Sequence, residues 1–322
     1  MRPLILPILL LVLVSCVDNS NVLEPTPAPF WQNIDQGDGL NDNEVYKIFE
    51  DSEGDIWLGT GDGIMRYDGD DLDDFPEVSS QLGYVFAITE DEDGAIWAGS
   101  EFGLGFYEGG TWAFLDSISG FDLGVLSLFT DEDGRVWIGT TILGLLYYDN
   151  GYFQVFDFEC NDCNFVNEIY QDSEENLWFG TVGGLKLLDG SSFELFTEAD
   201  DLPHIDVRAL EEDQWGRIWI GTRFGASVAV YDDGDIDAVS LQNGFTLNSV
   251  LTITEDRTGL IWIGIIGGGI ATFDGAVMRG IADPDGPGTA TIGAIMERSN
   301  GEIWVGSSEG IFVYGTNNQL LD

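Results

Sequence analysis

Few side chains in this sequence could carry out chemistry by themselves. The chain of 322 residues contains one histidine, His204, and three cysteines, of which Cys160 and Cys163 form a CxxC motif. A zinc site at this motif lacks two further ligands at suitable spacing, and a single histidine gives little support to a catalytic triad. We therefore expect no metal and no cofactor. We expect Cys160 and Cys163 to form a local disulfide in an exported protein, with free thiols as the alternative.

Carboxylates are the abundant reactive groups. The chain has 58 Asp and Glu residues against 11 Lys and Arg, which gives a formal net charge of -47. Such a field repels phosphate backbones, so we expect no nucleic-acid partner and no polybasic membrane contact. Two carboxylates at the right separation would support glycoside hydrolysis, but that separation is a property of the fold. Because 44% of the residues are hydrophobic, the chain is not an acidic disordered tail.

The N-terminal sequence predicts a targeting signal for export. Residues 1–15, MRPLILPILLLVLVS, place Arg2 before an apolar run that is too short to span a bilayer comfortably. The next residue is Cys16, and Leu-Val-Ser-Cys resembles a bacterial lipobox, which implies lipidation of Cys16 and export. An ordinary secretory signal is the alternative. Residues 16–29 are polar and Pro-rich and predict a flexible tether. Val17 in place of an Asp favours the outer over the inner membrane.

A repeat of about 41 residues fills the rest of the chain. Seven of the ten tryptophans lie 40 to 43 residues apart, and each is followed two positions later by Gly. Six have an Asp six positions before them, and Arg298 takes this place in the seventh. We expect each Trp to pack between neighbouring sheets and each Gly to let their backbones approach closely. We expect the acidic residues before each Trp to stabilise a tight turn rather than to bind calcium. The repeat tryptophans are Trp57, Trp97, Trp137, Trp178, Trp219, Trp262 and Trp304.

Each repeat predicts four short strands. In the first repeat these are residues 45–50, 56–60, 64–67 and 72–75, separated by Asp/Gly turns, and strong helix signals are absent. Four strands in 40–45 residues are typical of a β-propeller blade. The last repeat lacks a good fourth strand, and residues 30–34 resemble the missing one. We predict an all-β, seven-bladed β-propeller over residues 30–322, closed by its N-terminal strand, with four antiparallel strands per blade.

The repeats resemble those of the two-component regulator propeller family. Residues 43–60 read NEVYKIFEDSEGDIWLGT and residues 247–264 read LNSVLTITEDRTGLIWIG, close to the family pattern. The resemblance covers residues 30–322 and implies a periplasmic sensory propeller. This chain shows one ring, with no kinase, DNA-binding or membrane-spanning segment after it, so we expect a stand-alone lipoprotein that is a monomer.

Loops at one end of the ring are the predicted binding site. In propellers the loops between blades and those between second and third strands share one face, where ligands usually bind. We expect a non-catalytic module that binds a saccharide or peptide there, or contacts a membrane signalling or envelope protein. A polysaccharide-acting enzyme and an envelope scaffold are the alternatives. Asp62 and Glu101 add acids to this face, whose ligand-binding candidates are Tyr84, Phe102, Phe165, His204, Arg223, Phe224 and Asn248.

Overall fold

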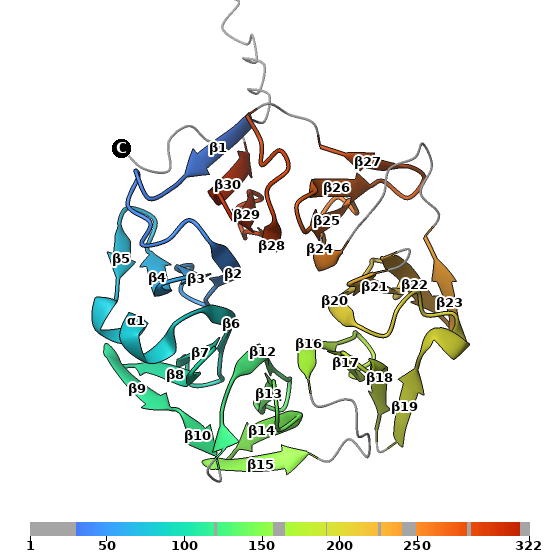
Figure 1. Ribbon diagram of the computed structural model, residues 1–322, viewed down its shortest axis with the longest axis horizontal. Helices are drawn as coiled ribbons and strands as arrows, with labels where there is room; N and C mark the ends of the chain where they lie inside the picture. The colour runs from blue at the N-terminus through green and yellow to red at the C-terminus, as the bar shows by residue number, and fades with distance from the viewer. Residues whose placement is uncertain are drawn as a thin grey trace, which may run out of the picture.

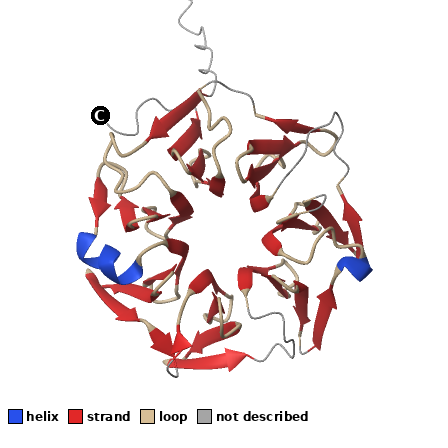
Figure 2. Cartoon of the chain, viewed as in Figure 1, coloured by secondary structure: helices blue, strands red, loops and turns tan. Residues whose placement is uncertain are grey.

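Seven four-stranded antiparallel sheets stand around a central channel, as Figures 1 and 2 show. The computed structural model describes residues 30–118, 121–156, 165–190, 192–224, 227–239, 249–281 and 285–315. Each sheet is one blade, and its first strand lies at the channel. The predicted fold class, a seven-bladed all-β propeller, is confirmed.

The blades follow the sequence repeats one by one. From the channel outward, blades one to three comprise β2 (Val45–Glu50), β3 (Ile56–Thr60), β4 (Gly63–Tyr67) and β5 (Leu72–Asp74); β6 (Val85–Glu90), β7 (Ile96–Ser100), β8 (Gly103–Glu108) and β9 (Thr111–Leu115); and β12 (Val125–Thr130), β13 (Val136–Thr140), β14 (Leu145–Asp149) and β15 (Tyr152–Phe156). Blades four to six comprise β16 (Val166–Gln171), β17 (Leu177–Thr181), β18 (Gly184–Asp189) and β19 (Ser192–Phe196); β20 (Val207–Glu212), β21 (Ile218–Thr222), β22 (Val228–Asp232) and β23 (Asp235–Ala238); and β24 (Val250–Glu255), β25 (Ile261–Ile265), β26 (Gly269–Phe273) and β27 (Met278–Gly280). Blade seven comprises β28 (Ile292–Glu297), β29 (Ile303–Ser307), β30 (Gly310–Gly315) and β1 (Phe30–Ile34).

The N-terminal strand closes the ring. β1 pairs antiparallel with β30 as the outermost strand of blade seven, in the register Phe30 to Gly315. Trp31 is buried and packs edge-on against Trp262 of the neighbouring blade, with ring centroids 6.5 Å apart. The predicted closure by residues 30–34 is confirmed, and it covers the sheet edge that β30 would otherwise expose.

The repeat Asp stabilises both its turn and the repeat Trp. In the first blade one carboxylate oxygen of Asp51 accepts the backbone N–H groups of Glu53 at 3.0 Å and Asp55 at 2.9 Å. This is the turn chemistry that the sequence predicts. The other oxygen accepts the indole N–H of Trp57 at 2.7 Å, a contact that the sequence reading missed. The same Asp–Trp bond recurs in the next five blades.

The repeat Gly lets neighbouring blades touch. A Cβ placed on Gly59 would lie 2.6 Å from the backbone oxygen of Val85, the first residue of the next blade's inner strand. At Gly306 of blade seven the same atom would lie 2.9 Å from the oxygen of Val45 in blade one. Seven apolar clusters fill the seven interfaces between adjacent blades, and the repeat tryptophans belong to them.

Helical structure interrupts the ring after the first blade, contrary to the expectation of no helix. Helix α1 (Pro76–Leu82) begins with Pro at its first turn, ends before Gly83, and buries Val78 and Leu82. Proline at the start and glycine just past the end are ordinary helix signals. Phe75 is therefore the residue before a helix rather than the end of a strand. A 3-10 turn, η1 (Glu198–Asp200), and a small hairpin of β10 (Ser117–Ile118) and β11 (Phe121–Asp122) are further additions.

Several predicted features lie outside the described residues. These are the signal peptide over residues 1–15, the tether over 16–29, Cys16, the Cys160–Cys163 pair and Asn248. In the part of the chain that the structure describes, no helix is both long and apolar enough to cross a membrane.

Candidate functional site

One face of the ring gathers the loops that the sequence singles out. In each blade a backbone hydrogen bond joins the loop before the first strand to the loop between the second and third strands. Examples are Glu101 N–H to Tyr84 O at 3.0 Å and Arg223 N–H to Asp206 O at 2.9 Å. We call this side the top face, and the opposite side, which holds the turns between first and second strands, the bottom face. The predicted sharing of one face by the two loop sets is confirmed.

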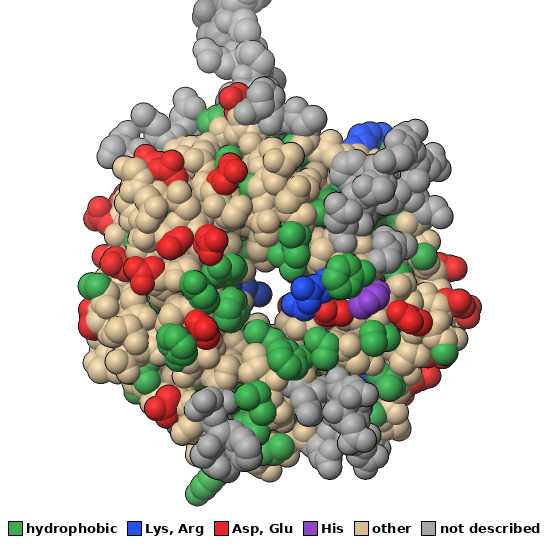
Figure 3. Space-filling view, viewed as in Figure 1, with side chains coloured by type: hydrophobic (Ala, Val, Ile, Leu, Met, Phe, Trp, Pro, Cys, Tyr) green, Lys and Arg blue, Asp and Glu red, His purple; other side chains and the backbone are tan. Residues whose placement is uncertain are grey.

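The top face carries exposed apolar side chains around the channel mouth (Figure 3). Six of the eleven large hydrophobic residues that are exposed in the described ranges belong to its loops. Exposed apolar groups that gather on one face commonly mark a binding surface. Asp62 and Glu101 are exposed on the same face. The six apolar residues are Tyr84, Phe102, Ile142, Phe165, Phe224 and Ile266, four of which the sequence reading had named.

At blade five the top-face candidates meet a buried carboxylate. Asp206 binds the guanidinium of Arg208 through two hydrogen bonds, of 2.6 and 3.0 Å, and lies 3.6 Å from that of Arg223. Its backbone N–H donates to Nδ1 of His204 at 3.0 Å. Phe224 packs against both the His204 ring, at 5.3 Å, and the Arg223 guanidinium, at 5.2 Å. We call these five residues the blade-five cluster.

Across the mouth, three aromatic rings from blades one and two pack together. Tyr46 lies 6.0 Å from Tyr84 and 5.4 Å from Phe86, measured between ring centroids. The Tyr46 hydroxyl donates to the Glu44 carboxylate. Burial and this hydrogen bond raise the pKa of Tyr46, so its hydroxyl stays protonated. The mouth therefore has an aromatic side and, opposite it, a side with two guanidinium groups.

The channel wall comes from a β-bulge repeated in all seven inner strands. In β2 the pairing with β3 shifts between Val45 and Lys47, and the other six inner strands shift at the matching place. A bulge re-aims side chains; here the bulged residue lines the channel in every blade, and in five blades its successor does so too. The channel has a cavity of about 500 Å³. Sequence reading missed this wall, although a comparison of the repeats shows Lys47, Glu168 and Arg208 at positions that are small or apolar in most blades.

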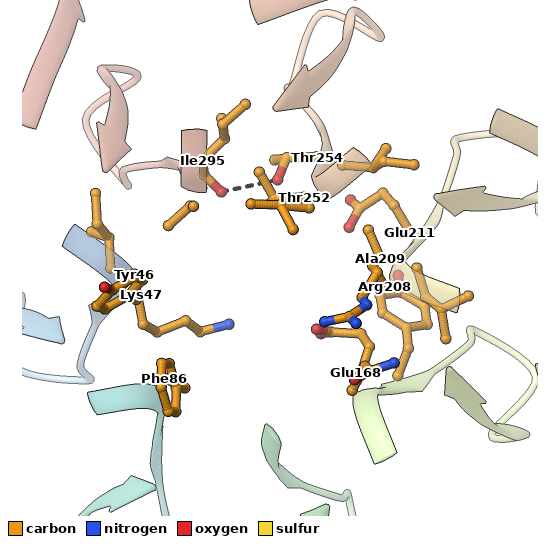
Figure 4. Close-up of a pocket in the computed structure, with 18 of the residues that line it drawn as sticks. Tyr46, Lys47, Phe86, Glu168, Arg208, Ala209, Glu211, Thr252, Thr254 and Ile295 are labelled. Atoms are coloured by element: carbon orange, nitrogen blue, oxygen red, sulfur yellow. Dashed lines mark hydrogen bonds between the residues drawn. The ribbon is translucent and has the colours of Figure 1, made fainter. Parts of the chain in front are cut away.

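Charged groups of both signs face the cavity below the mouth (Figure 4). Lys47 of β2 extends into the channel from one wall, and Glu168 of β16 and Glu211 of β20 occupy the other. Burial, with smaller contributions from the nearby carboxylates of Glu255 and Glu168, raises the pKa of Glu211 to about 8, although the backbone N–H of Glu255 partly offsets the effect. Burial also raises the pKa of Glu168, an effect that Lys47 partly offsets. Glu211 is consequently protonated in much of the population at neutral pH.

At the bottom face the channel carboxylates join adjacent blades. Glu90 of blade two accepts the backbone N–H of Ser52 in blade one at 2.8 Å and its hydroxyl at 2.6 Å. Glu50 of blade one accepts the same pair of bonds from Ser299 of blade seven, at 2.7 and 2.8 Å. These acids are structural. No group of three or more His, Cys, Asp or Glu side chains suited to hold a metal occurs in the described residues.

Comparison with known proteins agrees with this architecture. The two component regulator propeller model matches residues 39–62, 119–141, 162–183 and 201–224, each of which spans the start of a blade. These four segments are repeats of the two-component regulator propeller family. No curated protein matches the sequence.

Solved structures similar to this two-component regulator propeller share its fold. The extracellular domain of BT3049 from B. thetaiotaomicron, described as a hybrid two-component system, is 22% identical with a TM-score of 0.73, and the match covers 91% of this chain but 42% of that one. Virginiamycin B lyase from Staphylococcus aureus is 14% identical with a TM-score of 0.73, covering 89% and 99%. PorZ of Porphyromonas gingivalis, a surface component of the type-IX secretion system, is 17% identical with a TM-score of 0.66, covering 87% and 47%.

Proposed function

We propose that this propeller is an exported recognition module, sensory in role, that binds a ligand at the top-face mouth of its channel. The repeat gives every blade the same Trp and Gly, yet the side chains at the mouth differ from blade to blade. Aromatic rings on one side and two arginines on the other offer stacking and charge-assisted hydrogen bonds to a saccharide or peptide. The family supports a sensory role, with the signal passed to a separate membrane protein.

The observation that carries this proposal is the placement of cations. In a chain of net charge -47, Lys47 and Arg208 line the channel and Arg223 lies at its mouth, where the single carboxylate of Asp206 contacts both guanidinium groups. Six other arginines each pair with an acid elsewhere on the ring: Arg66, Arg135, Arg217, Arg257, Arg279 and Arg298. A cluster of cations at a concave mouth is unusual in so acidic a protein, and it therefore indicates a functional site.

A matched pair of surface variants tests the location of the site. Phe224 on the top face is 53% exposed beside Arg223, and Trp215 on the bottom face is 60% exposed beside Arg217. A glycan array and a peptide library would be screened with the wild type. For each hit, Phe224→Ala is expected to weaken binding about tenfold, since one buried aromatic contact is worth about 1–2 kcal/mol. Trp215→Ala should leave binding unchanged, and equal effects of the two changes would disprove a top-face site.

A second candidate function is a polysaccharide-acting enzyme with paired carboxylates. Glu211 and Glu168 line one cavity, and the raised pKa of Glu211 suits a general acid near neutral pH. The test is product analysis of every saccharide that binds. Turnover that disappears in Glu211→Gln while binding persists would establish the enzyme, and binding without products would favour the recognition module.

Export and anchorage form a separate part of the proposal. The lipobox-like sequence before Cys16 supports cleavage ahead of this residue and its lipidation. Mass spectrometry of the mature N-terminus, compared with a Cys16→Ser variant, tests this directly. An unmodified residue other than Cys16 at the mature N-terminus would support an ordinary secretory signal instead.

A further inference from the structure

The middle of the channel places an ammonium group and two carboxyl groups on facing walls of one cavity. Lys47 comes from blade one, whereas Glu168 and Glu211 come from blades four and five on the other side (Figure 4). All three side chains line the same space of about 500 Å³. Cavities of this size accept small ligands up to a few residues of peptide in length.

Two of these three groups lack the hydrogen-bond and ion-pair partners that the buried acids of the bottom face possess. Among the described residues, Lys47 Nζ makes no ion pair or hydrogen bond, and the same holds for the Glu168 carboxylate. Glu211 accepts one hydrogen bond, from the backbone N–H of Glu255 at 3.2 Å. By contrast, Asp213 on the bottom face accepts bonds from two side chains and two backbone groups.

Partly buried charges without partners cost stability, which a charged ligand would recover. Two neutral polar groups of the cavity are already engaged, since Thr254 Oγ1 donates to Ile295 O at 3.0 Å and Asn167 Nδ2 donates to Val207 O at 2.8 Å. These two groups are therefore not available to a neutral sugar. The wall offers a carboxylate the Lys47 ammonium. On the opposite side it offers an ammonium two carboxyl groups, and the neighbouring Arg208 guanidinium is already bound by Asp206.

The apolar remainder of the wall suits the body of such a ligand. Tyr46 and Phe86 stand on the same side as Lys47, and Leu126 and Leu251 also line the cavity. Small residues such as Ala294 keep the middle of the channel open. A ligand that spans the channel would thus meet aromatic rings beside the ammonium and carboxyl groups on the opposite wall.

We propose that the channel binds a small zwitterion, an α-amino acid or short unblocked peptide, with its carboxylate at Lys47 and its ammonium at Glu168 and Glu211. This inference rests on the proposed recognition function and specifies its ligand class. Lys47 on one wall and the two glutamates on the other then bind the two ends of one molecule. The blade-five cluster and the aromatic rings at the mouth stand at the entrance of this path.

The experiment separates the two contacts. The twenty L-amino acids and the dipeptides Ala-Phe and Gly-Leu would be screened by thermal shift, and the strongest binder would be measured by calorimetry beside its N-acetylated and C-amidated forms. With the wild type, each blocked form should bind at least tenfold more weakly. Lys47→Met should bind the acid and the amide equally. Glu168→Gln should bind the amine and its acetylated form equally.

Charge-matched controls lie far from the channel. Arg279→Met and Glu194→Gln change the net charge by the same amounts on outer strands and should keep the wild-type preference. Lys47→Arg preserves the cation and should retain the preference for the free carboxylate. Thermal melting of each variant shows that it is folded.

Three results would overturn the zwitterion proposal. The first is that no unblocked compound binds at millimolar concentration, and the second is that blocked and unblocked forms bind alike. The third is a variant that loses all binding without the end-specific pattern. A saccharide that binds in a Phe224-dependent manner while every zwitterion fails would overturn this inference and leave the proposed recognition function intact.

Discussion

The two ends of the channel use acidic and aromatic residues in opposite ways. At the bottom face, acids repeat from blade to blade and accept hydrogen bonds from the preceding blade, as Glu90 does from Ser52 and Glu212 from Ser173. At the top face, the aromatic rings and arginines follow no repeat, and many are exposed. The bottom holds the ring together, whereas the top is free to vary, because backbone hydrogen bonds between its loops already fix their course.

This difference teaches where function is to be sought in a repeat protein. A residue that recurs in every blade fulfils a structural requirement common to all blades, such as a partner for a buried indole N–H or a close approach of two backbones. A residue that occurs in only one blade has a role specific to that blade. Lys47, Glu168 and Arg208 are of the second kind, and all three face the channel.

Removal of a bottom-face acid should have the largest effect on stability. The Asp213 side chain is fully buried and accepts bonds from Trp219, Arg217 and two backbone N–H groups. Asp213→Ala is expected to lower the free energy of unfolding by about 3 kcal/mol, because several donors lose a charged acceptor. Urea titration would measure this loss. Asp62→Ala on the top face, an exposed control, should change it by less than about 0.5 kcal/mol.

The pH dependence of stability should reveal the channel carboxyl groups. With its pKa raised to about 8, Glu211 in the folded state keeps a proton that the unfolded chain has lost, so stability falls as pH rises from about 5 to 8. Burial also raises the pKa of the Glu168 and Glu255 carboxyl groups, which therefore contribute to the slope in the same direction. Glu211→Gln should flatten the slope and raise stability at pH 8 by about 2 kcal/mol, seen in melts across a pH series. An unchanged slope would contradict this.

The seam that closes the ring should respond to loss of its carboxylate. Glu50→Ala removes two hydrogen bonds from Ser299 and an ion pair with Arg298 at 3.5 Å. We expect a loss of about 1–2 kcal/mol in the free energy of unfolding. Glu90→Ala, at the equivalent seam between blades one and two, is the matched comparison. Because Glu50 has the additional ion pair, its loss should equal or slightly exceed that of Glu90, and a clearly smaller loss for Glu50→Ala would contradict its role at the closing seam.

Exposed apolar side chains of the top face should contribute least to folding. Phe102 and Ile142 are 53% and 54% exposed. The double variant Phe102→Ser/Ile142→Ser is expected to alter the free energy of unfolding by less than about 0.5 kcal/mol, measured by chemical denaturation. A loss above about 1 kcal/mol would mean that these side chains support the fold, and it would remove the contrast between the two ends.

The sequence predicts the ring well because its blades repeat the same structural residues at the same positions. Trp57, Gly59 and Asp51 are visible at fixed spacing, and their packing follows from their chemistry. Closure by residues 30–34 follows from counting strands. The sequence does not predict helix α1, because seven residues are too few to show a helical hydrophobic periodicity, although Pro76 and Gly83 mark its ends.

The candidate site is harder to predict from sequence, and for a physical reason. The loop residues Arg223, Phe224 and His204 are recognisable from their place in the repeat, and the structure brings them together around Asp206. The channel wall depends on a β-bulge, which turns two successive side chains of one strand toward the cavity. Strict alternation along the strand would have assigned Tyr46 and Lys47 to opposite faces.

The pairing of β1 with β30 has a consequence for how the protein folds. Asn33 Nδ2 donates to Ile311 O at 3.3 Å across 278 residues of chain, so the first strand to be synthesised waits for the last. Closing so long a loop costs only about 2 kcal/mol more than closing one within a blade, because loop entropy grows logarithmically. The delay is therefore kinetic. Until closure the ring is an open crescent that exposes apolar sides of blades one and seven, and a second copy can supply the missing strand. Refolding at high protein concentration should thus yield strand-swapped chains of propellers, whereas dilution should favour single rings.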